Sequence, residues 1–383
     1  MPILPPLPKD PLAIEVTEFA TRNNLAARYR ELDREPAFPH AEYRAMGATG
    51  LLGLGIPTAL GGRGLALPQV GLALFHLAYR GGTVFGKVSL QPEFCSVLAD
   101  HGSPELVEEW FRPMVRGEKI VGNQITEPGA GSDAQGMSLI ATREGNDYVL
   151  TGEKSEVALC LDADAAIVYG RVPGADPRGG ITAFLVPQDL PGIARHPTLG
   201  DLGERWQRRG TATYDRVRLP IRYRLGEEGK GFDYLRSELT QERALLAAIY
   251  LGAAFASWDA TLAYTQERTV FGKPLARQEG VSFPLAQDIA RLSSDWLFIE
   301  DTLARLDRGE EAAGEAALAK WMAVEDGLRA ADHAIQFHGG RGYSKDLPHE
   351  QRWRDIRAGG IAHGPSEIML VVAAHEVRTR RRS

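Results

Sequence analysis

The sequence is poor in cysteine and has no excess of positive charge. Two cysteines among 383 residues, Cys95 and Cys160, are too few for a disulfide framework and lack a metal-ligand spacing. This usage is typical of a reducing compartment, so we expect a cytoplasmic protein. The net charge of −6, from 44 Lys and Arg against 50 Asp and Glu, provides no general attraction to nucleic acid or to an anionic membrane. We interpret the one basic cluster, at 378–382, as a solvated tail.

Long apolar runs and several common motifs are also missing. No run reaches the roughly 18 to 20 apolar residues that a membrane span needs, and the longest, 244–257, has the length of a buried core helix. Prolines and the lack of a basic flank make residues 1–12 unlike a signal peptide. There is no P-loop, no strand–GxGxxG–helix unit and no HExxH or Cys/His metal pattern. We therefore expect no membrane, nucleic-acid or metal partner.

The periodicity of apolar residues changes twice along the chain. Residues 12–118 read as helices with breaks at Gly61-Gly62 and Gly81-Gly82, and 107–115 as an amphipathic helix interrupted at Pro113. Between 120 and 224, short β-branched and aromatic runs at 147–150, 166–169 and 182–186 predict strands, with Pro187 and Pro220 at strand ends. Helical spacing returns at 231–267, 279–308, 311–338 and 365–377, the pattern of a four-helix bundle. We predict a mainly α fold with a central β domain, divided into 1–119, 120–225 and 226–383.

Three glycine-containing segments could carry chemistry. Residues 126–133 (TEPGAGSD) could aim backbone N–H groups at an anion, although a β-domain turn explains them equally well. In 267–273 (ERTVFGK), Arg268 could bind a phosphate and Phe271 could stack on a ring, but a surface arginine is the alternative. Residues 336–343 (QFHGGRGY) could contact a partner closely or simply end a helix.

Taken in order, the motifs resemble the acyl-CoA dehydrogenase family nearly end to end. The resemblance rests on GLLGLGIP (50–57), TEPGAGSD, RLP (218–220), QER (241–243), ERTVFGK, FHGGRGY (337–343), WRD (353–355) and GPSEI (364–368). It implies an N-terminal helical domain, a middle β-barrel and a C-terminal four-helix bundle, assembled as a homodimer or homotetramer. It also implies a flavoenzyme that holds FAD between domains and across a subunit interface.

The resemblance assigns cofactor and substrate residues by position. Thr126 would contact the flavin ring and Ser132 the FAD diphosphate, which Arg268 would also bind. The remaining positions implied for FAD are Phe271 and Gln278 near the adenosine half, and the loop of Gln336, Gly339 and Gly340 from a neighbouring subunit. Arg243 and Gly364 are expected at the acyl-CoA substrate.

In the family reaction, a carboxylate removes the proton next to a thioester carbonyl while a hydride leaves the next carbon for the flavin. A dry carboxylate suits this role because burial raises its proton affinity. The commoner family position for this base holds His363 here, whereas the position of the isovaleryl- and long-chain branches holds Glu242. We therefore predict Glu242 as the base. A salt-bridged surface glutamate is the alternative, and His363 is either a secondary acid/base or a residue that shapes the pocket.

One segment departs from the family pattern. After GEK (152–154) the family continues with an aromatic and then Ile-Thr-Asn, but here Ser155 or Glu156 takes the aromatic's place and Ala158 that of the hydroxyl. Pro365 also replaces the usual Thr or Ser after Gly364. A carboxylate near the flavin would oppose its anionic reduced form, and loss of the aromatic could admit oxygen. Three hypotheses follow: an acyl-CoA dehydrogenase that passes electrons to an electron-transfer flavoprotein, an oxidase or oxygenase that uses O2, and a silent interaction partner.

Overall fold

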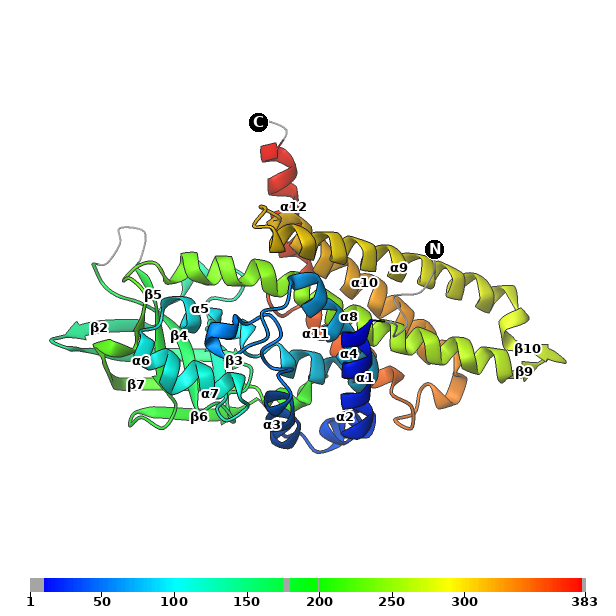
Figure 1. The fold of residues 1–383 in the computed structure, drawn as a ribbon, viewed down its shortest axis with the longest axis horizontal. Coiled ribbons are helices and arrows are strands. Elements are labelled where there is room, and N and C mark those ends of the chain that lie inside the picture. The colour runs from blue at the N-terminus through cyan, green and yellow to red at the C-terminus, as the bar shows by residue number, and fades with distance from the viewer. Residues whose placement is uncertain (1–9, 175–179, 199, 381–383) are drawn as a thin grey trace.

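The computed structural model describes residues 10–174, 180–198 and 200–380. A helical body and a β-sheet lie at opposite ends of its longest axis (Figure 1). Most of the proline-rich N-terminal stretch, and residues 381 and 382 of the basic cluster, lie outside the described residues.

Helices of 3 to 23 residues form the first part of the chain. They begin at Asp10, whose side chain caps the first helix by accepting hydrogen bonds from the N–H groups of Leu12 and Ala13. In order they are α1 (Pro11–Arg22), α2 (Leu25–Arg34), α3 (His40–Ala48), η1 (Thr58–Leu60), α4 (Leu67–Ser89), η2 (Glu93–Cys95), α5 (Ser96–His101), α6 (Pro104–Leu106), η3 (Val107–Phe111) and α7 (Arg112–Val115).

Of the predicted helix breaks, that at Gly81-Gly82 is confirmed and that at Pro113 is wrong. At Gly81-Gly82, α4 consists of two helical segments that meet at a kink, where Gly82 adopts the non-helical φ 74° and ψ 176°. Pro113 does not interrupt the helical run, which continues without a gap from Pro104 to Val115. The irregularity comes earlier, as the π-helical turn η3.

The sheet has the order β6-β7-β3-β2-β4-β5-β8, with β1 paired in parallel to β4. Its strands are β1 (Val121–Gln124), β2 (Ile140–Glu144), β3 (Asp147–Val157), β4 (Ala165–Arg171), β5 (Ile181–Pro187), β6 (Ile193–Pro197), β7 (Gly210–Pro220) and β8 (Arg224–Leu225). All three predicted strands are present, and Pro187 and Pro220 are the last residues of β5 and β7. The η4 (Ala134–Gly136), η5 (Arg205–Gln207) and η6 (Ile221–Tyr223) turns lie between strands.

The C-terminal part is organised around one long helix. The 37 residues of α8 (Gly231–Glu267) span about 55 Å at 1.5 Å per residue, from β5 of the sheet to the far hairpin. The remaining elements are β9 (Thr269–Val270), β10 (Lys273–Pro274), η7 (Leu275–Arg277), α9 (Glu279–Asp307), α10 (Ala313–Phe337), η8 (Gly339–Arg341), α11 (His349–Gly359) and α12 (Ser366–Arg380). By length and hydropathy α8 could span a membrane, but 83% of its most apolar window is buried inside the protein. Helix α11 is an element that the apolar periodicity did not predict.

The hydrophobic core has two parts that meet beside η2. One joins α1–α4 to the bundle helices, and the other joins α5–α7 to the sheet. Phe94 belongs to the first part and Cys95 to the second, and both Cys95 and Cys160 are buried as free thiols. The N-terminal helices are therefore shared between the two cores, and the junction lies next to Glu242.

Candidate active site

Helix α8 carries a buried glutamate toward the turn that precedes α12. The Glu242 side chain is only 4% exposed, and its Oε2 lies 3.0 Å from Nδ1 of His363. No donor among the described residues hydrogen-bonds to the other carboxylate oxygen, Oε1. The structure thus brings together both residues predicted for catalysis and leaves one oxygen of Glu242 available to a ligand.

An unusual turn presents His363 to Glu242. His363 has φ 54° and Gly364 has φ 92°, so both residues adopt the left-handed region. Lys320 of α10 donates to the carbonyl oxygens of Ala362 and, at 2.6 Å, Gly364. Nε of Arg243 lies 3.3 Å from the carbonyl oxygen of His363. Arg243 therefore contacts the backbone of the turn, and Gly364 lies beside its guanidinium, where an added Cβ would be 3.4 Å from Nη2.

Burial sets the protonation of this pair. It raises the pKa of Glu242 to about 8, with Arg243 acting in the opposite direction. Burial, reinforced by Lys87 and Lys320, lowers the pKa of His363 to about 3, so the imidazole is neutral near pH 7. Because the carboxylate gains a proton near neutral pH, Glu242 has the proton affinity of a general base.

Two neighbouring side chains complete the surroundings of the pair. The ring of Phe94 stacks on His363 with 5.1 Å between ring centroids. One turn before Glu242, the buried Glu238 accepts hydrogen bonds from Ser96 Oγ (3.2 Å), the Val97 N–H (3.4 Å) and Asn123 Nδ2 (3.4 Å). Burial and the charge of Glu242 raise the pKa of Glu238 well above its usual range. The two carboxylates therefore titrate as a coupled pair.

The TEPGAGSD loop follows β1 and lies near this site. Asn123, which contacts Glu238, is three residues before Thr126, a reach of about 10 Å at most. The Thr126 carbonyl accepts the N–H of Ser155 on β3. Glu127 anchors the loop through a buried ion pair, with 2.9 Å between Lys154 Nζ and Oε1.

The tip of the same loop has the properties of an anion site. Ser132 is exposed, and a Cβ added at Gly129 or Gly131 would meet no atom within 4 Å. Among the described residues no acceptor is hydrogen-bonded to the N–H of Gly131 or Ser132. Free N–H groups, an exposed hydroxyl and an uncrowded backbone fit a phosphate. The residues present therefore suit the diphosphate of FAD.

The segment that departs from the family pattern forms a bulge. The β3–β7 register shifts between Lys154 and Val157, and Glu156 adopts φ 55° while Ser155 is buried. Glu156 Oε2 lies 3.1 Å from Nη1 of Arg209, which also pairs with Asp201. The repulsion expected from Glu156 is therefore reduced by a neighbouring guanidinium.

The other residues predicted for FAD lie at the far end of α8. Arg268 ends the helix, and Phe271 at the tip of the β9–β10 hairpin is 97% exposed. The loop of Gln336, Gly339 and Gly340 is at the same end, because His338 stacks on Tyr264 of α8 with 4.2 Å between ring centroids. Gln278, between η7 and α9, is partly buried.

Within one chain these two groups of residues cannot hold the same dinucleotide. Arg268 follows Glu242 by 26 positions on a continuous helix, which corresponds to about 40 Å. Figure 1 shows the β9–β10 hairpin and the sheet at opposite ends of the molecule. Arg268 and Ser132 of one chain therefore lie too far apart to bind the same diphosphate. A complete FAD site of the predicted kind needs residues from a second chain.

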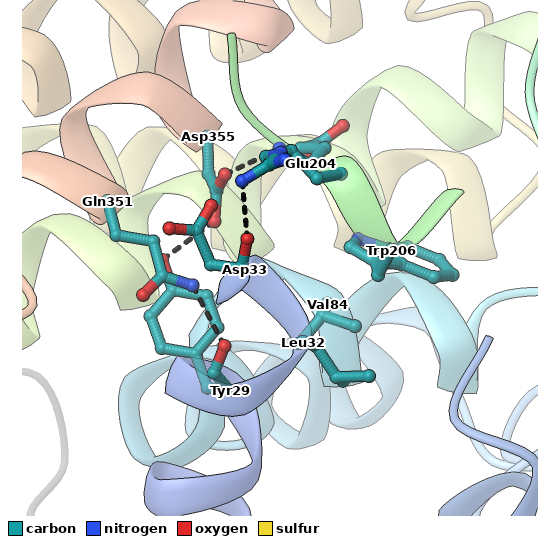
Figure 2. A pocket seen from close by; sticks show the side chains of 9 residues that line it. Tyr29, Leu32, Asp33, Val84, Glu204, Trp206, Gln351 and Asp355 are labelled. Carbon is teal, nitrogen blue, oxygen red and sulfur yellow. Dashed lines mark hydrogen bonds between the residues drawn. The ribbon is translucent and has the colours of Figure 1, made fainter. Parts of the chain in front are cut away.

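A small cavity is lined by side chains several of which hydrogen-bond to one another (Figure 2). Lys87 Nζ lies 2.6 Å from Glu204 Oε2, and both side chains are buried. Asp355 accepts the N–H of Glu204 at 2.6 Å and the hydroxyl of Tyr29 at 2.7 Å. The cavity is lined by Tyr29, Leu32, Asp33, Val84, Glu204, Arg205, Trp206, Gln351 and Asp355. It contains none of the predicted site residues and joins α2, α4 and α11 to the loop before η5.

Three family models match successive parts of the chain. They describe the N-terminal, middle and C-terminal domains of acyl-CoA dehydrogenases and cover residues 11–118, 122–217 and 229–377. The chain belongs to the acyl-CoA dehydrogenase family. As a member it is an FAD-dependent oxidoreductase, which confirms the family, fold, enzyme class and cofactor predicted from the motifs.

Relatives of this acyl-CoA dehydrogenase family member span almost its whole length. The human short-chain specific acyl-CoA dehydrogenase, mitochondrial, is 34% identical over 92% of this chain and 86% of its own length. The butyryl-CoA dehydrogenase structure from Megasphaera elsdenii has a TM-score of 0.90 at 27% identity, covering 97% of this chain and all of that one. The prolyl acyl carrier protein oxidase AnaB has a TM-score of 0.89 at 25% identity, covering 96% and 97%.

Several residues of the site were missed from the sequence. Lys320, Glu238 and Phe94 surround the Glu242–His363 pair, and Arg209 forms an ion pair with Glu156. The sequence pattern does predict that Lys320 is buried, because Ala316, Ala323 and Gly327 lie on the same apolar face of its helix.

Proposed function

We propose that this chain catalyses α,β-dehydrogenation of an acyl-CoA thioester, with Glu242 as the base. The observation that carries the proposal is the buried Glu242 carboxylate, which is held through Oε2 by His363 while Oε1 has no donor among the described residues. Oε1 is the atom that would take the proton from the carbon next to the thioester carbonyl. FAD, when bound, supplies the acceptor for the hydride that leaves the next carbon.

The surroundings of Glu242 favour proton abstraction. Its raised pKa, about 8, gives the carboxylate the affinity to accept a proton from a weakly acidic carbon. The ring of Phe94 over His363 and the meeting of the two core clusters limit the access of water. Arg243 supports the turn through the His363 carbonyl and lies next to Gly364, on the side where we expect the acyl group.

We further propose that each FAD is held by two chains in a homodimer or a homotetramer. Thr126 and Ser132 would come from the chain that supplies Glu242. A second chain would supply Arg268, Phe271 and Gln278, with the loop of Gln336, Gly339 and Gly340. The separation of about 40 Å along α8 supports this arrangement, since one chain cannot bring both groups to one cofactor.

A second candidate function uses molecular oxygen as the electron acceptor instead of an electron-transfer flavoprotein. Ser155, Glu156 and Ala158 stand where the family resemblance expects an aromatic and a threonine against the flavin. The similarity to AnaB, which is named as an oxidase, favours the same candidate. A carrier-protein thioester would then be an alternative to the CoA thioester.

Anaerobic flavin reduction tests the proposal. The FAD-loaded protein is mixed with a panel of short, branched and aromatic acyl-CoAs, and bleaching of the flavin absorbance is followed. Reduction by at least one of them, with slow reoxidation in air and rapid transfer to electron-transfer flavoprotein, is expected. Fast reoxidation by oxygen would select the second candidate, and no reduction by any thioester would reject both.

The substitution Glu242→Gln tests the base. It preserves the size of the side chain but removes the proton acceptor, so flavin reduction should slow about 10³-fold with FAD still bound. Glu300→Gln, the same change at an exposed position of α9, is the matched control and should leave the rate unchanged. A near-normal rate in Glu242→Gln would transfer the role of base to His363.

A further inference from the structure

Three successive carbonyl groups in the turn before α12 are bound by cations. Lys320 donates to the carbonyls of Ala362 and Gly364, and Arg243 donates to that of His363 between them. The cations come from α10 and α8, so the turn is held from two helices. The same turn carries the imidazole that contacts Glu242.

The position of Lys320 is costly for a lysine. The residue is 1% exposed on the buried face of α10, and no carboxylate among the described residues pairs with it. Burial lowers the pKa of Lys320 to about 7, reinforced by Arg243 and Lys87. A leucine or methionine would avoid this cost, but it could not bind the two carbonyls.

We propose that Lys320 is a positioning residue that holds the 362–364 turn and thereby keeps His363 hydrogen-bonded to the catalytic base Glu242. This role of Lys320 rests on the proposed function, in which Glu242 is the base. When Glu242 is ionised it can only accept, so Nδ1 of the neutral His363 must carry the hydrogen. The imidazole then fixes Oε2 and leaves Oε1 free, and Lys320 controls this geometry without touching the substrate.

The charges around the pair must be considered in any pH experiment. Other ionisable groups reach it from α4, η2, the β4 strand, the loop before η5, α8 and α10: Lys87, Glu93, Cys95, Tyr169, Glu204, Glu238, Arg243 and Lys320. Loss of Lys320 removes one of these charges as well as the two hydrogen bonds. A test must therefore separate a direct effect of its charge on Glu242 from an effect through His363.

The first test needs no turnover. Nitrogen NMR of ¹⁵N-histidine-labelled holoenzyme, with the His363 signal assigned from His363→Gln, should show an Nδ1–H tautomer above the pKa of Glu242 in the wild type. Lys320→Met should convert this signal to that of an imidazole exchanging between tautomers. Lys230→Met, an exposed lysine at the start of α8, is the control and should leave the signal unchanged. An unaltered His363 signal in Lys320→Met would overturn the proposal, whether or not the enzyme reduces its flavin.

The second test is a double-mutant cycle on the pH profile of flavin reduction. Lys320→Met should raise the apparent pKa of the base by about one unit, since a hydrogen bond to the ionised carboxylate is lost. In a His363→Ala background the same substitution should cause no further shift. An equal shift in both backgrounds would mean that Lys320 acts directly through its charge, and would overturn the proposal.

If Lys320→Met does not fold, Lys320→Gln can be tested in its place. Lys320→Gln retains N–H donors for the turn, so it should fold and give a smaller shift in the same direction. FAD content and circular dichroism report folding in each variant. If Lys320→Met does not fold, a shift in Lys320→Gln that is equal in the wild-type and His363→Ala backgrounds would contradict the proposal.

Discussion

Glu238 and Glu242 lie one helical turn apart on the same buried face of α8. Glu238 accepts three hydrogen bonds, which favour its ionised form, and two nearby anions disfavour each other. No cation pairs with Glu238 in the part of the chain that the structure describes. Burial and the charge of Glu242 outweigh these bonds and raise the pKa of Glu238 well above its usual range, so Glu238 keeps its proton while Glu242 titrates.

Glu238→Gln should leave the apparent pKa of the base unchanged. Glu242 acts in its ionised form, so flavin reduction in the wild type should rise with pH through a midpoint near 8. A protonated Glu238 carries no charge to remove, so the midpoint should stay near 8 and the rate at pH 7 should remain that of the wild type. The measurement is stopped-flow reduction between pH 6 and 9, with Glu300→Gln as control. A midpoint that falls by about one unit would mean that Glu238 is ionised while Glu242 titrates, which would contradict this prediction.

At the residue scale, the sequence could identify the base but not what tunes it. The QER motif and its family resemblance pointed to Glu242, and His363 stood out because it occupies the other base position. Their hydrogen bond depends on the left-handed backbone at His363 and on Lys320 from another helix. These contacts join residues that are 42 or more positions apart in the sequence. Tertiary packing brings such residues together, and the local periodicity of apolar residues does not predict it.

At the scale of the element, the kink of α4 depends on one glycine. Gly82 has φ 74° and ψ 176°, a region essentially restricted to glycine, and a Cβ added there would lie 2.4 Å from the Tyr29 ring. Gly82→Ala should destabilise the protein by about 3 kcal/mol, from backbone strain and overpacking together. Denaturant unfolding of the holoenzyme measures this.

Gly309 offers a matched control for the same substitution. It also has a positive φ, 73°, but an added Cβ would meet nothing within 4 Å. Gly309→Ala should therefore report backbone strain alone, about 1 kcal/mol. Equal losses at both positions would show that contact with Tyr29 does not constrain the kink.

The elements show which sequence signals are reliable. The ranges predicted for the long bundle helices differ from α8, α9 and α10 by two residues or fewer, because their apolar spacing is sustained over many turns. Helix α11 was missed because it is short, rich in charged residues and buried through ion pairs such as Arg354–Asp33 and not through an apolar stripe. Pro113 was misread because the helical run continues through it, with the π-helical turn η3 directly before α7.

At the scale of the whole molecule, the order of motifs along the chain revealed the family and the fold, but not how the cofactor residues divide. The family resemblance assigns both Ser132 and Arg268 to the FAD diphosphate without saying which chain supplies each. The length of α8 separates them, which becomes visible only when the helix is continuous and straight (Figure 1). The exposed aromatic Phe271 at the hairpin tip is then a surface that a second chain can cover.

Hybrid assembly tests this division directly. Ser132→Glu and Arg268→Glu each place an anion where a phosphate is expected, so either variant alone should lose FAD by repulsion. If each site takes Ser132 from one chain and Arg268 from another, a hybrid of the two variants contains one intact site and one doubly altered site. Co-expression in equal amounts should restore FAD to about a quarter of all sites, by random pairing in a dimer with two symmetric interfaces. Hybrids isolated with two different affinity tags should hold one FAD per two chains, and tagged hybrids without flavin would contradict a cofactor shared between subunits.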